Sequence, residues 1–169
     1  MKSRRCFAMI LSTHAIVGGA IASLFSSDPI LAAAAAFASH FAIDAIPHWD
    51  YPLRSISVGK GAHNRRLRLN RAVMIDLICI GVDACAGLAL AIWLFATPAS
   101  AWVIALSAIA AMAPDPLQFV HSIHPREPLV TLQRFHRWIH CNRRLAWKLG
   151  VSSQLAFAAA VSAGAGAFR

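Results

Sequence analysis

The sequence predicts an all-α membrane protein, a polytopic helical bundle of four to five transmembrane helices plus one interfacial amphipathic helix. Hydrophobic residues make up 58% of the 169 residues and charged residues only 14%, which is more apolar than an ordinary soluble domain with one core. The mean hydropathy of the chain is +0.57. The apolar residues form long runs, and most charged residues lie between them. Together these observations favour a polytopic membrane protein over a soluble one.

Each long apolar run is expected to form a helix, because the runs exceed the length of strands and are rich in Ala and Leu. A helix needs about 20 apolar residues to cross the hydrocarbon core of a membrane. The second run is mostly Ala, and the last is short and contains Gly. These two are therefore the weakest candidates, and the last fits a spanning, re-entrant or groove-bound helix equally. The runs are 7–25, 30–46, 73–96, 99–120 and 151–168.

The chain has room for a single membrane-embedded helical domain over residues 1–169, with long loops at about 48–72 and 121–149. These loops and the N-terminus carry nearly all of the Lys and Arg residues, whereas the short connections SSDP and TPAS contain none. Lys and Arg prefer the cytoplasmic side of a membrane. We therefore expect the N-terminus and both long loops in the cytoplasm, which accounts for the net charge of +9 without a nucleic-acid partner.

The second long loop contains a candidate amphipathic helix. Leu132, Phe135, Trp138 and Ile139 recur at helical spacing, with arginines between them. Such a helix lies at the membrane surface with its basic residues against anionic headgroups, which makes membrane lipids the expected partners. A solvated basic helix packed on the bundle is the alternative.

Ionisable side chains gather at the end of the second apolar run, in the stretch SHFAIDAIPHWDYP. His40 and Asp44 are four residues apart, so they share one helix face and can reach one metal ion. His48 and Asp50 follow after a proline. An ionisable group inside a membrane protein costs several kcal/mol unless it is paired or bound to metal, so this concentration indicates a functional site.

Further ionisable residues are expected at the same cytoplasmic end of the bundle. A mixture of His and carboxylate donors suits zinc, manganese or iron, and more than four donors suggest two divalent ions. A proton relay, an ion path or structural hydrogen bonding would use the same residue types. The predicted metal ligands are His14, His40, Asp44, His48, Asp50, Asp115 and His136, with Asp76 and His140 as second-tier ligands or supporting residues.

Several of these segments resemble a known family. TH in the first run, SHFAIDAIPHWDYP, PDPLQF and LQRFHRWIH are similar to small bacterial inner-membrane proteins classed as membrane-bound metal-dependent hydrolases, the group that includes the LexA-regulated hydrolase. The resemblance covers most of the chain up to about residue 140. It implies a multi-pass helical protein with a metal centre at the matching positions. The chain departs from the family pattern in one segment, because FHRWIH stands where relatives carry HRGxTHS. The matching positions are His14, His40, Asp44, His48, Asp50 and Asp115.

The expected function is therefore that of a metal-dependent hydrolase of the bacterial inner membrane, with a cytoplasm-facing His/Asp site acting on a phosphoester or lipid headgroup. Divalent ions can activate water and hold the oxygens of such a group. Two alternatives stay open: a small transporter or proton-conducting protein, and a non-enzymatic membrane protein with a structural metal site. The candidates for binding an anionic substrate are Arg65, Arg66, Arg68 and Arg137.

Overall fold

The computed structural model describes residues 7–52, 71–141, 143 and 145–168, which form seven helices and two short strands. Among the described residues the two strands, of three residues each, are the only regular structure besides the helices. In chain order the elements are β1 (Phe7–Met9), α1 (Leu11–Leu24), α2 (Pro29–Asp44), β2 (Asp50–Pro52), α3 (Arg71–Phe95), α4 (Ala101–Met112), α5 (Pro114–Ile123), α6 (Leu129–Ile139) and α7 (Trp147–Ala167).

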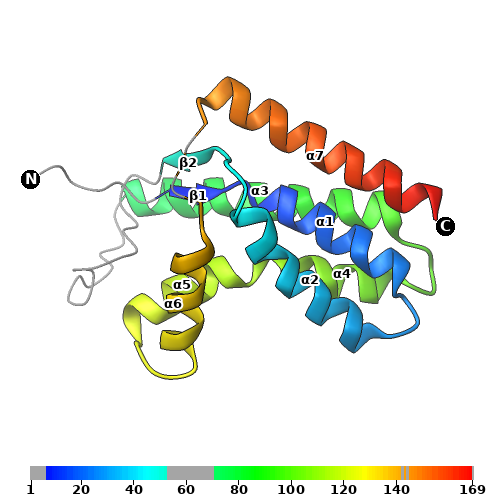
Figure 1. The fold of residues 1–169 in the computed structure, drawn as a ribbon, viewed down its shortest axis with the longest axis horizontal. Helices are drawn as coiled ribbons and strands as arrows, with labels where there is room; N and C mark the ends of the chain where they lie inside the picture. Colours follow the sequence, from blue (N-terminus) through cyan, green and yellow to red (C-terminus); the bar gives the residue numbers. More distant parts are fainter. Residues whose placement is uncertain (1–6, 53–70, 142, 144, 169) are drawn as a thin grey trace, which may run out of the picture.

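Helix α1 lies at the centre of the bundle and contacts α2, α3, α4 and α7 (Figure 1). The turns α1–α2 and α3–α4 and the C-terminus lie together at one end of the molecule, whereas the β1–β2 pair and the α5–α6 hairpin lie toward the other (Figure 1). We call these the turn end and the hairpin end. All five long apolar segments therefore run between the same two ends.

Small residues let the central helices pack closely. A Cβ atom on Gly18 would lie 2.7 Å from both the Cβ atom of Ala111 and the carbonyl oxygen of Ser107. Helices α1 and α4 therefore approach at a distance that only glycine allows at this position. Close backbone approach through small residues is a usual way for membrane helices to associate, because lipid provides no hydrophobic force between them.

Two helices, α3 and α7, are long and apolar enough to cross a membrane. Helices α4 and α5 would make a third span if the pair is taken as one broken helix, bent by 48°. Large apolar side chains on α3 are exposed, including Trp93 at 77% and Val82 at 65%. Such exposure is costly in water but favourable against lipid, so the described part of the chain is compatible with a membrane protein.

The bundle of four to five spans is not confirmed. Helices α1 and α2 have only 14 and 16 residues, short of the length of about 20 that a straight span needs. The expected first helix loses its start to β1, because residues 7–9 pair antiparallel with residues 50–52. The strands were not predicted, since three residues are too few for an alternating pattern.

Two helix boundaries also differ from expectation. The run at 99–120 is divided between α4 and α5, because Pro114 has no backbone N–H to continue the ladder of α4. The last helix begins at Trp147 instead of residue 151 and reaches 21 residues. The loop expected at 121–149 therefore holds the end of α5, all of α6 and the start of α7.

Candidate metal centre

Asp44, the last residue of α2, lies at the centre of a buried group of histidines. Its side chain is 2% exposed, and the Nε2 atom of His136 lies 2.7 Å from its Oδ2 atom. The Nε2 atom of His40 lies 3.2 Å from the same oxygen, and the Nε2 atom of His14 lies 3.3 Å from Oδ1. One carboxylate thus faces three imidazoles, which are themselves almost fully buried.

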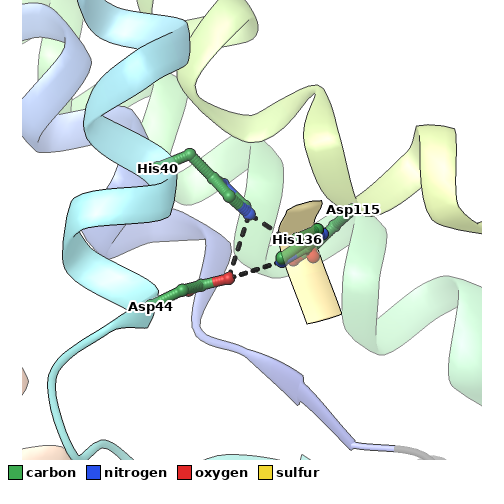
Figure 2. Close-up of side chains that lie close together, drawn as sticks. All are labelled: His40, Asp44, Asp115 and His136. Carbon is green, nitrogen blue, oxygen red and sulfur yellow. Dashed lines mark hydrogen bonds and ion pairs between the residues drawn. The ribbon is translucent and has the colours of Figure 1, made fainter. Parts of the chain in front are cut away.

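Helical spacing and helix crossing bring these residues together. His40 and Asp44 are four residues apart on α2 and lie one turn from each other. The His14 ring, on α1, stacks on the His40 ring with centroids 4.0 Å apart. Asp115, in the first turn of α5, places an oxygen 3.7 Å from the Nε2 atom of His40. Figure 2 shows His40, Asp44, Asp115 and His136 converging from α2, α5 and α6.

Backbone carbonyls fix the orientation of three histidine rings. The Nδ1 atom lies 2.8 Å from the carbonyl of Ala111 in His40, 2.7 Å from that of Ile46 in His48, and 3.0 Å from that of Cys141 in His140. A carbonyl only accepts, so each Nδ1 carries the hydrogen and donates. In the neutral ring Nε2 then carries a lone pair. This arrangement is the usual one for metal-binding histidines, whose second nitrogen donates to a carbonyl or carboxylate.

Several buried polar atoms of the cluster make no hydrogen bond to the described residues. The Nε2 atom of His40, the Nε2 atom of His48 and the Oδ2 atom of Asp115 are among them. The lone pair on His40 Nε2 faces carboxylate oxygens, and two lone-pair atoms this close need a proton or a cation between them. The donor set therefore fits a divalent ion.

Two groups of donor atoms meet the spatial requirement for an ion. His40, Asp44, Asp115 and His136 form the first, which we call the four-donor group, and Asp44, His48 and His140 form the second, the three-donor group. Within each group all donor atoms lie within 4.8 Å of one another. Asp44 belongs to both groups, so its carboxylate could connect two ions.

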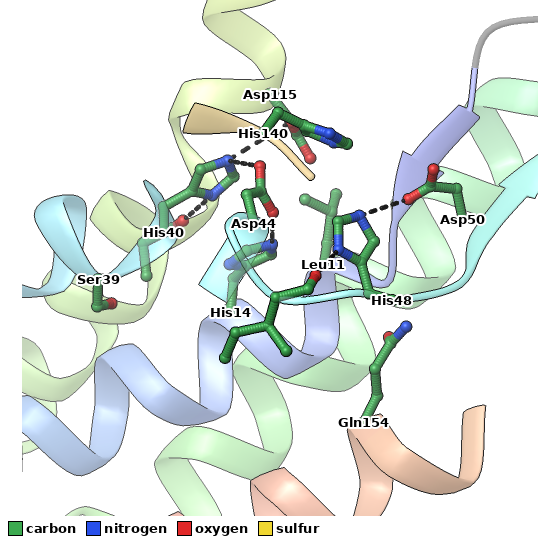
Figure 3. Close-up of polar contacts among 12 residues, drawn as sticks. Leu11, His14, Ser39, His40, Asp44, His48, Asp50, Asp115, His140 and Gln154 are labelled. Atoms are coloured by element: carbon green, nitrogen blue, oxygen red, sulfur yellow. Dashed lines mark hydrogen bonds and ion pairs between the residues drawn. The ribbon is translucent and has the colours of Figure 1, made fainter. Parts of the chain in front are cut away.

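The chain between α6 and α7 holds the three-donor group in place. The N–H of Cys141 donates to the carbonyl of Asp44 over 2.8 Å, and the N–H of Leu145 donates to the carbonyl of His48 over 3.0 Å. Figure 3 shows the contact of His48 with Asp50, and the His140 ring has its centroid 5.0 Å from that of His48. The segment after α6 thus lies along the segment after α2, which explains how His140 reaches His48.

His48 also interacts with Asp50, whose Oδ1 atom lies 2.9 Å from its Nε2 atom. Burial disfavours the charged imidazole, but the interactions with Asp50 and the Ile46 carbonyl outweigh burial and raise the pKa of His48 above its ordinary value. Strand β2 begins at Asp50 and pairs this residue with Met9 of β1. The short strands therefore hold the carboxylate beside the histidine.

The structure brings most of the predicted site residues together. His40, Asp44, Asp115 and His136 share one group, and His48 lies in the other. His140 was expected in a secondary role and instead lies in the three-donor group. His14 contacts Asp44 and His40 from outside both groups, and Asp50 contacts His48 in the same way.

Other predicted residues lie elsewhere. Asp76 is buried on α3 and belongs to neither donor group of the described residues. Arg137 is exposed on α6, one residue from His136. Arg65, Arg66 and Arg68 lie outside the described residues.

Sequence reasoning did not identify two buried amides. Gln133 is 1% exposed on α6, and neither polar atom of its side chain has a hydrogen-bond partner among the described residues. Its position three residues before His136, on the same helix face, was the available signal. Gln154 donates to the carbonyl of Trp49 over 2.9 Å and so connects α7 to the segment that carries His48. Nothing local in the sequence indicates that contact.

No protein-family model, no curated protein and no solved structure matches this chain.

Proposed function

We propose that this chain is a membrane-bound metal-dependent hydrolase whose active site is the His/Asp centre around Asp44. The observation that carries the proposal is the orientation of His40 and His48, each of which donates Nδ1–H to a backbone carbonyl and leaves a buried Nε2 atom facing carboxylate oxygens. The sequence resemblance to the bacterial metal-dependent hydrolases of the inner membrane is a second, separate reason for the proposal.

The proposed cofactor is a pair of divalent ions, with zinc, manganese or iron as the candidates. The four-donor and three-donor groups would hold one ion each and share Asp44. Mixed imidazole and carboxylate donors without thiolate suit these metals. When bound, such ions act as Lewis acids toward ester oxygens and acidify water. His14 would keep Asp44 oriented through the contact between its Nε2 atom and Asp44 Oδ1.

The proposed membrane arrangement has four to five membrane segments, with α1 and α2 as short ones, and the N-terminus and the hairpin end in the cytoplasm. The support is the distribution of charge, because basic residues cluster in the segments of the hairpin end and are absent from both short turns. Helix α6 would lie at the inner membrane surface, where its exposed residues Arg134, Arg137 and Trp138 suit anionic headgroups.

A reporter fused after Ser100 tests this arrangement. Ser100 lies in the turn between α3 and α4, so a phosphatase reporter that needs a non-cytoplasmic environment is expected to be active there. A second fusion after Arg143 should be inactive. Activity of the reporter at Arg143 and not at Ser100 would contradict the proposed orientation.

The proposed substrate is a phosphoester or a lipid headgroup at the inner leaflet. The centre lies beside α6, whose exposed arginines could hold a phosphate: Arg137 is adjacent to the donor His136. Arginine suits this role because its guanidinium binds phosphate oxygens in pairs. Arg65, Arg66 and Arg68 are further candidates on the basis of sequence position.

The position of Asp83 is evidence against the transport alternative. Its carboxylate accepts a hydrogen bond of 2.6 Å from the N–H of Leu11, the first residue of α1. An N-terminal amide of a helix has no partner within the helix, so Asp83 satisfies a structural need there. A structural metal site differs from a catalytic one by lacking an open coordination position, and hydrolysis assays separate the two.

The test of the hydrolase proposal is turnover of phosphoesters by the metal-loaded protein in lipid nanodiscs. We would assay bis-(p-nitrophenyl) phosphate and anionic phospholipids with wild type, Asp44→Asn and His124→Ala, a matched histidine variant at an exposed position outside both donor groups. We expect activity in wild type and His124→Ala and a loss of about 100-fold or more in Asp44→Asn. Equal activity in Asp44→Asn would contradict the proposed site.

A further inference from the structure

We infer that the two donor groups have different roles: the four-donor group holds a permanent ion that fastens the α5–α6 hairpin to the bundle, and the three-donor group holds an exchangeable ion with an open coordination position. The inference rests on the metal centre proposed above and not on hydrolysis. It concerns the regulation of the centre, because occupancy of the second group would then follow the supply of free divalent ion.

The number of donors distinguishes the two groups. Four protein donors complete a tetrahedral site, which is typical of structural metal sites, whereas catalytic sites have three protein donors and keep one position open. Each group is buried except for one member, Asp115 in the four-donor group and His140 in the three-donor group, so the number of donors and not burial separates them. In the three-donor group only three donor atoms of the described residues lie within 4.8 Å of one another, and Asp50, 2.9 Å from His48, lies outside the group.

The charge of the donors also distinguishes the two groups. The four-donor group contains two carboxylates, Asp44 and Asp115, which balance the charge of one divalent ion. The three-donor group contains only the shared carboxylate of Asp44. Asp50 lies next to His48 but outside that group. A second ion in the three-donor group is therefore less neutralised by its donors, and affinity for hard divalent ions rises with the number of charged ligands.

The supporting structure also differs between the groups. Donors of the four-donor group come from helices α2, α5 and α6 (Figure 2), so an ion there joins the hairpin to the bundle. Apart from its partner α5, α6 contacts the bundle mainly through α2, so this ion would form a large part of the attachment. In the three-donor group His48 lies in a connection and His140 at the end of α6, where the ring is partly exposed. An ion held there can leave without separating helices.

The test is release of zinc from the saturated, detergent-purified protein during dialysis, followed by elemental mass spectrometry. We expect wild type to lose about one equivalent quickly and to retain about one. His140→Ala should bind about one equivalent and retain it, whereas His136→Ala should lose the retained class. The exposed His124 provides the control, since His124→Ala should behave as wild type.

A second readout follows the hairpin directly. Trypsin cleavage after Arg134 or Arg137 requires α6 to open, because both residues lie within the helix. We expect slow cleavage in zinc-loaded wild type and in His140→Ala, and cleavage at least about tenfold faster in His136→Ala. If His140→Ala loses its helical circular dichroism, His48→Gln replaces it, because His48 belongs only to the three-donor group.

The inference is overturned if both equivalents leave at one rate, if wild type binds a single equivalent, or if His140→Ala opens the hairpin and loses the retained ion. A zinc-free wild type would overturn the metal centre itself, and with it this inference. Two unequal zinc classes in a protein without hydrolase activity would support the inference while contradicting the proposed function.

Discussion

The two ends of the bundle satisfy their polar groups in different ways. At the turn end, Asp28 accepts a hydrogen bond from the N–H of Leu31 over 3.0 Å and caps α2, and the hydroxyls of Thr97 and Ser100 lie 2.9 Å apart. At the hairpin end, buried nitrogen and oxygen atoms of histidines and aspartates lack hydrogen-bond partners among the described residues. The turn end is thus explained by local structure, whereas the hairpin end gathers buried donor atoms that could hold a metal ion.

The turn end also has a cavity, whose lining contains polar side chains but no charged ones. The cavity has a volume of about 430 Å³ and is lined by Ser23, Leu24, Ser26, Ser27, Thr97, Ala99, Ser100 and Phe168. Hydroxyls cost little near water, whereas buried ionisable groups cost several kcal/mol unless they are paired. That cost is concentrated at the hairpin end, where the His/Asp groups that could hold a metal ion lie.

The largest expected effect is that of Asp44→Asn, compared with the same change at the opposite end, Asp28→Asn. Because Asp44 belongs to both donor groups, its replacement should abolish stabilisation by zinc, which is about 2.7 kcal/mol at an ion concentration about 100 times Kd. Asparagine caps helices as well as aspartate, so Asp28→Asn should keep the full response. Thermal unfolding with and without zinc measures the difference. An equal loss of stabilisation by zinc in both variants would contradict the difference between the two ends.

The next effect is expected for Gly18→Ala, with Gly81→Ala as its control. The new Cβ atom would lie 2.7 Å from the Cβ of Ala111, and overpacking of this kind costs about 1–3 kcal/mol. The shift would also move the Ala111 carbonyl that orients His40. No atom lies within 4 Å of a Cβ built on Gly81, so that variant should retain wild-type stability. Unchanged unfolding of Gly18→Ala would show that α1 and α4 can separate freely.

A smaller effect, confined to the hairpin end, is expected for Gly150→Ala. A Cβ atom at this position would collide with the side chain and backbone of Trp49, so α7 must move and the hydrogen bond from Gln154 to Trp49 weakens. We expect weaker zinc binding by the three-donor group, with little change in the ion held by the four-donor group. Gly164→Ala, on the same helix with no atom within 4 Å, is the matched control. Dialysis at graded zinc concentrations measures both variants.

The smallest effect is expected at the turn end. Thr97→Ala removes a contact at the surface between the hydroxyls of Thr97, which is exposed, and Ser100, which is half-buried. Surface changes of this kind alter the free energy of unfolding by about 0.5 kcal/mol or less. Zinc content should remain that of wild type. A drop in zinc content would mean that the turn end and the hairpin end are coupled, which would contradict the difference between them.

Local patterns in the sequence predicted the parts of the site that depend on one element. The four-residue spacing of His40 and Asp44 correctly placed both side chains on one face of α2. The histidine-bearing amphipathic helix was also expected, and α6 carries His136 on its buried face. Helical periodicity decides such placements before any tertiary contact forms.

Contacts between distant segments could not be predicted. The pairing of Met9 with Asp50, and the hydrogen bond from Cys141 to Asp44, depend on how the connections cross. The latter brings His140 to His48, which the spacing of histidines along α6 did not reveal. Proline at position 114 was visible in the sequence, but the bend that divides α4 from α5 was missed because hydropathy alone continued through it.

The most direct test of the metal centre is the metal content of the detergent-purified protein, measured by elemental mass spectrometry for wild type and for the double variant His40→Ala/Asp44→Ala. The proposed two-ion centre predicts about two equivalents of zinc, manganese or iron in wild type and loss of both in the double variant. Wild type that is free of metal after metal-replete purification, or a double variant with unchanged metal content, would contradict the proposed metal centre.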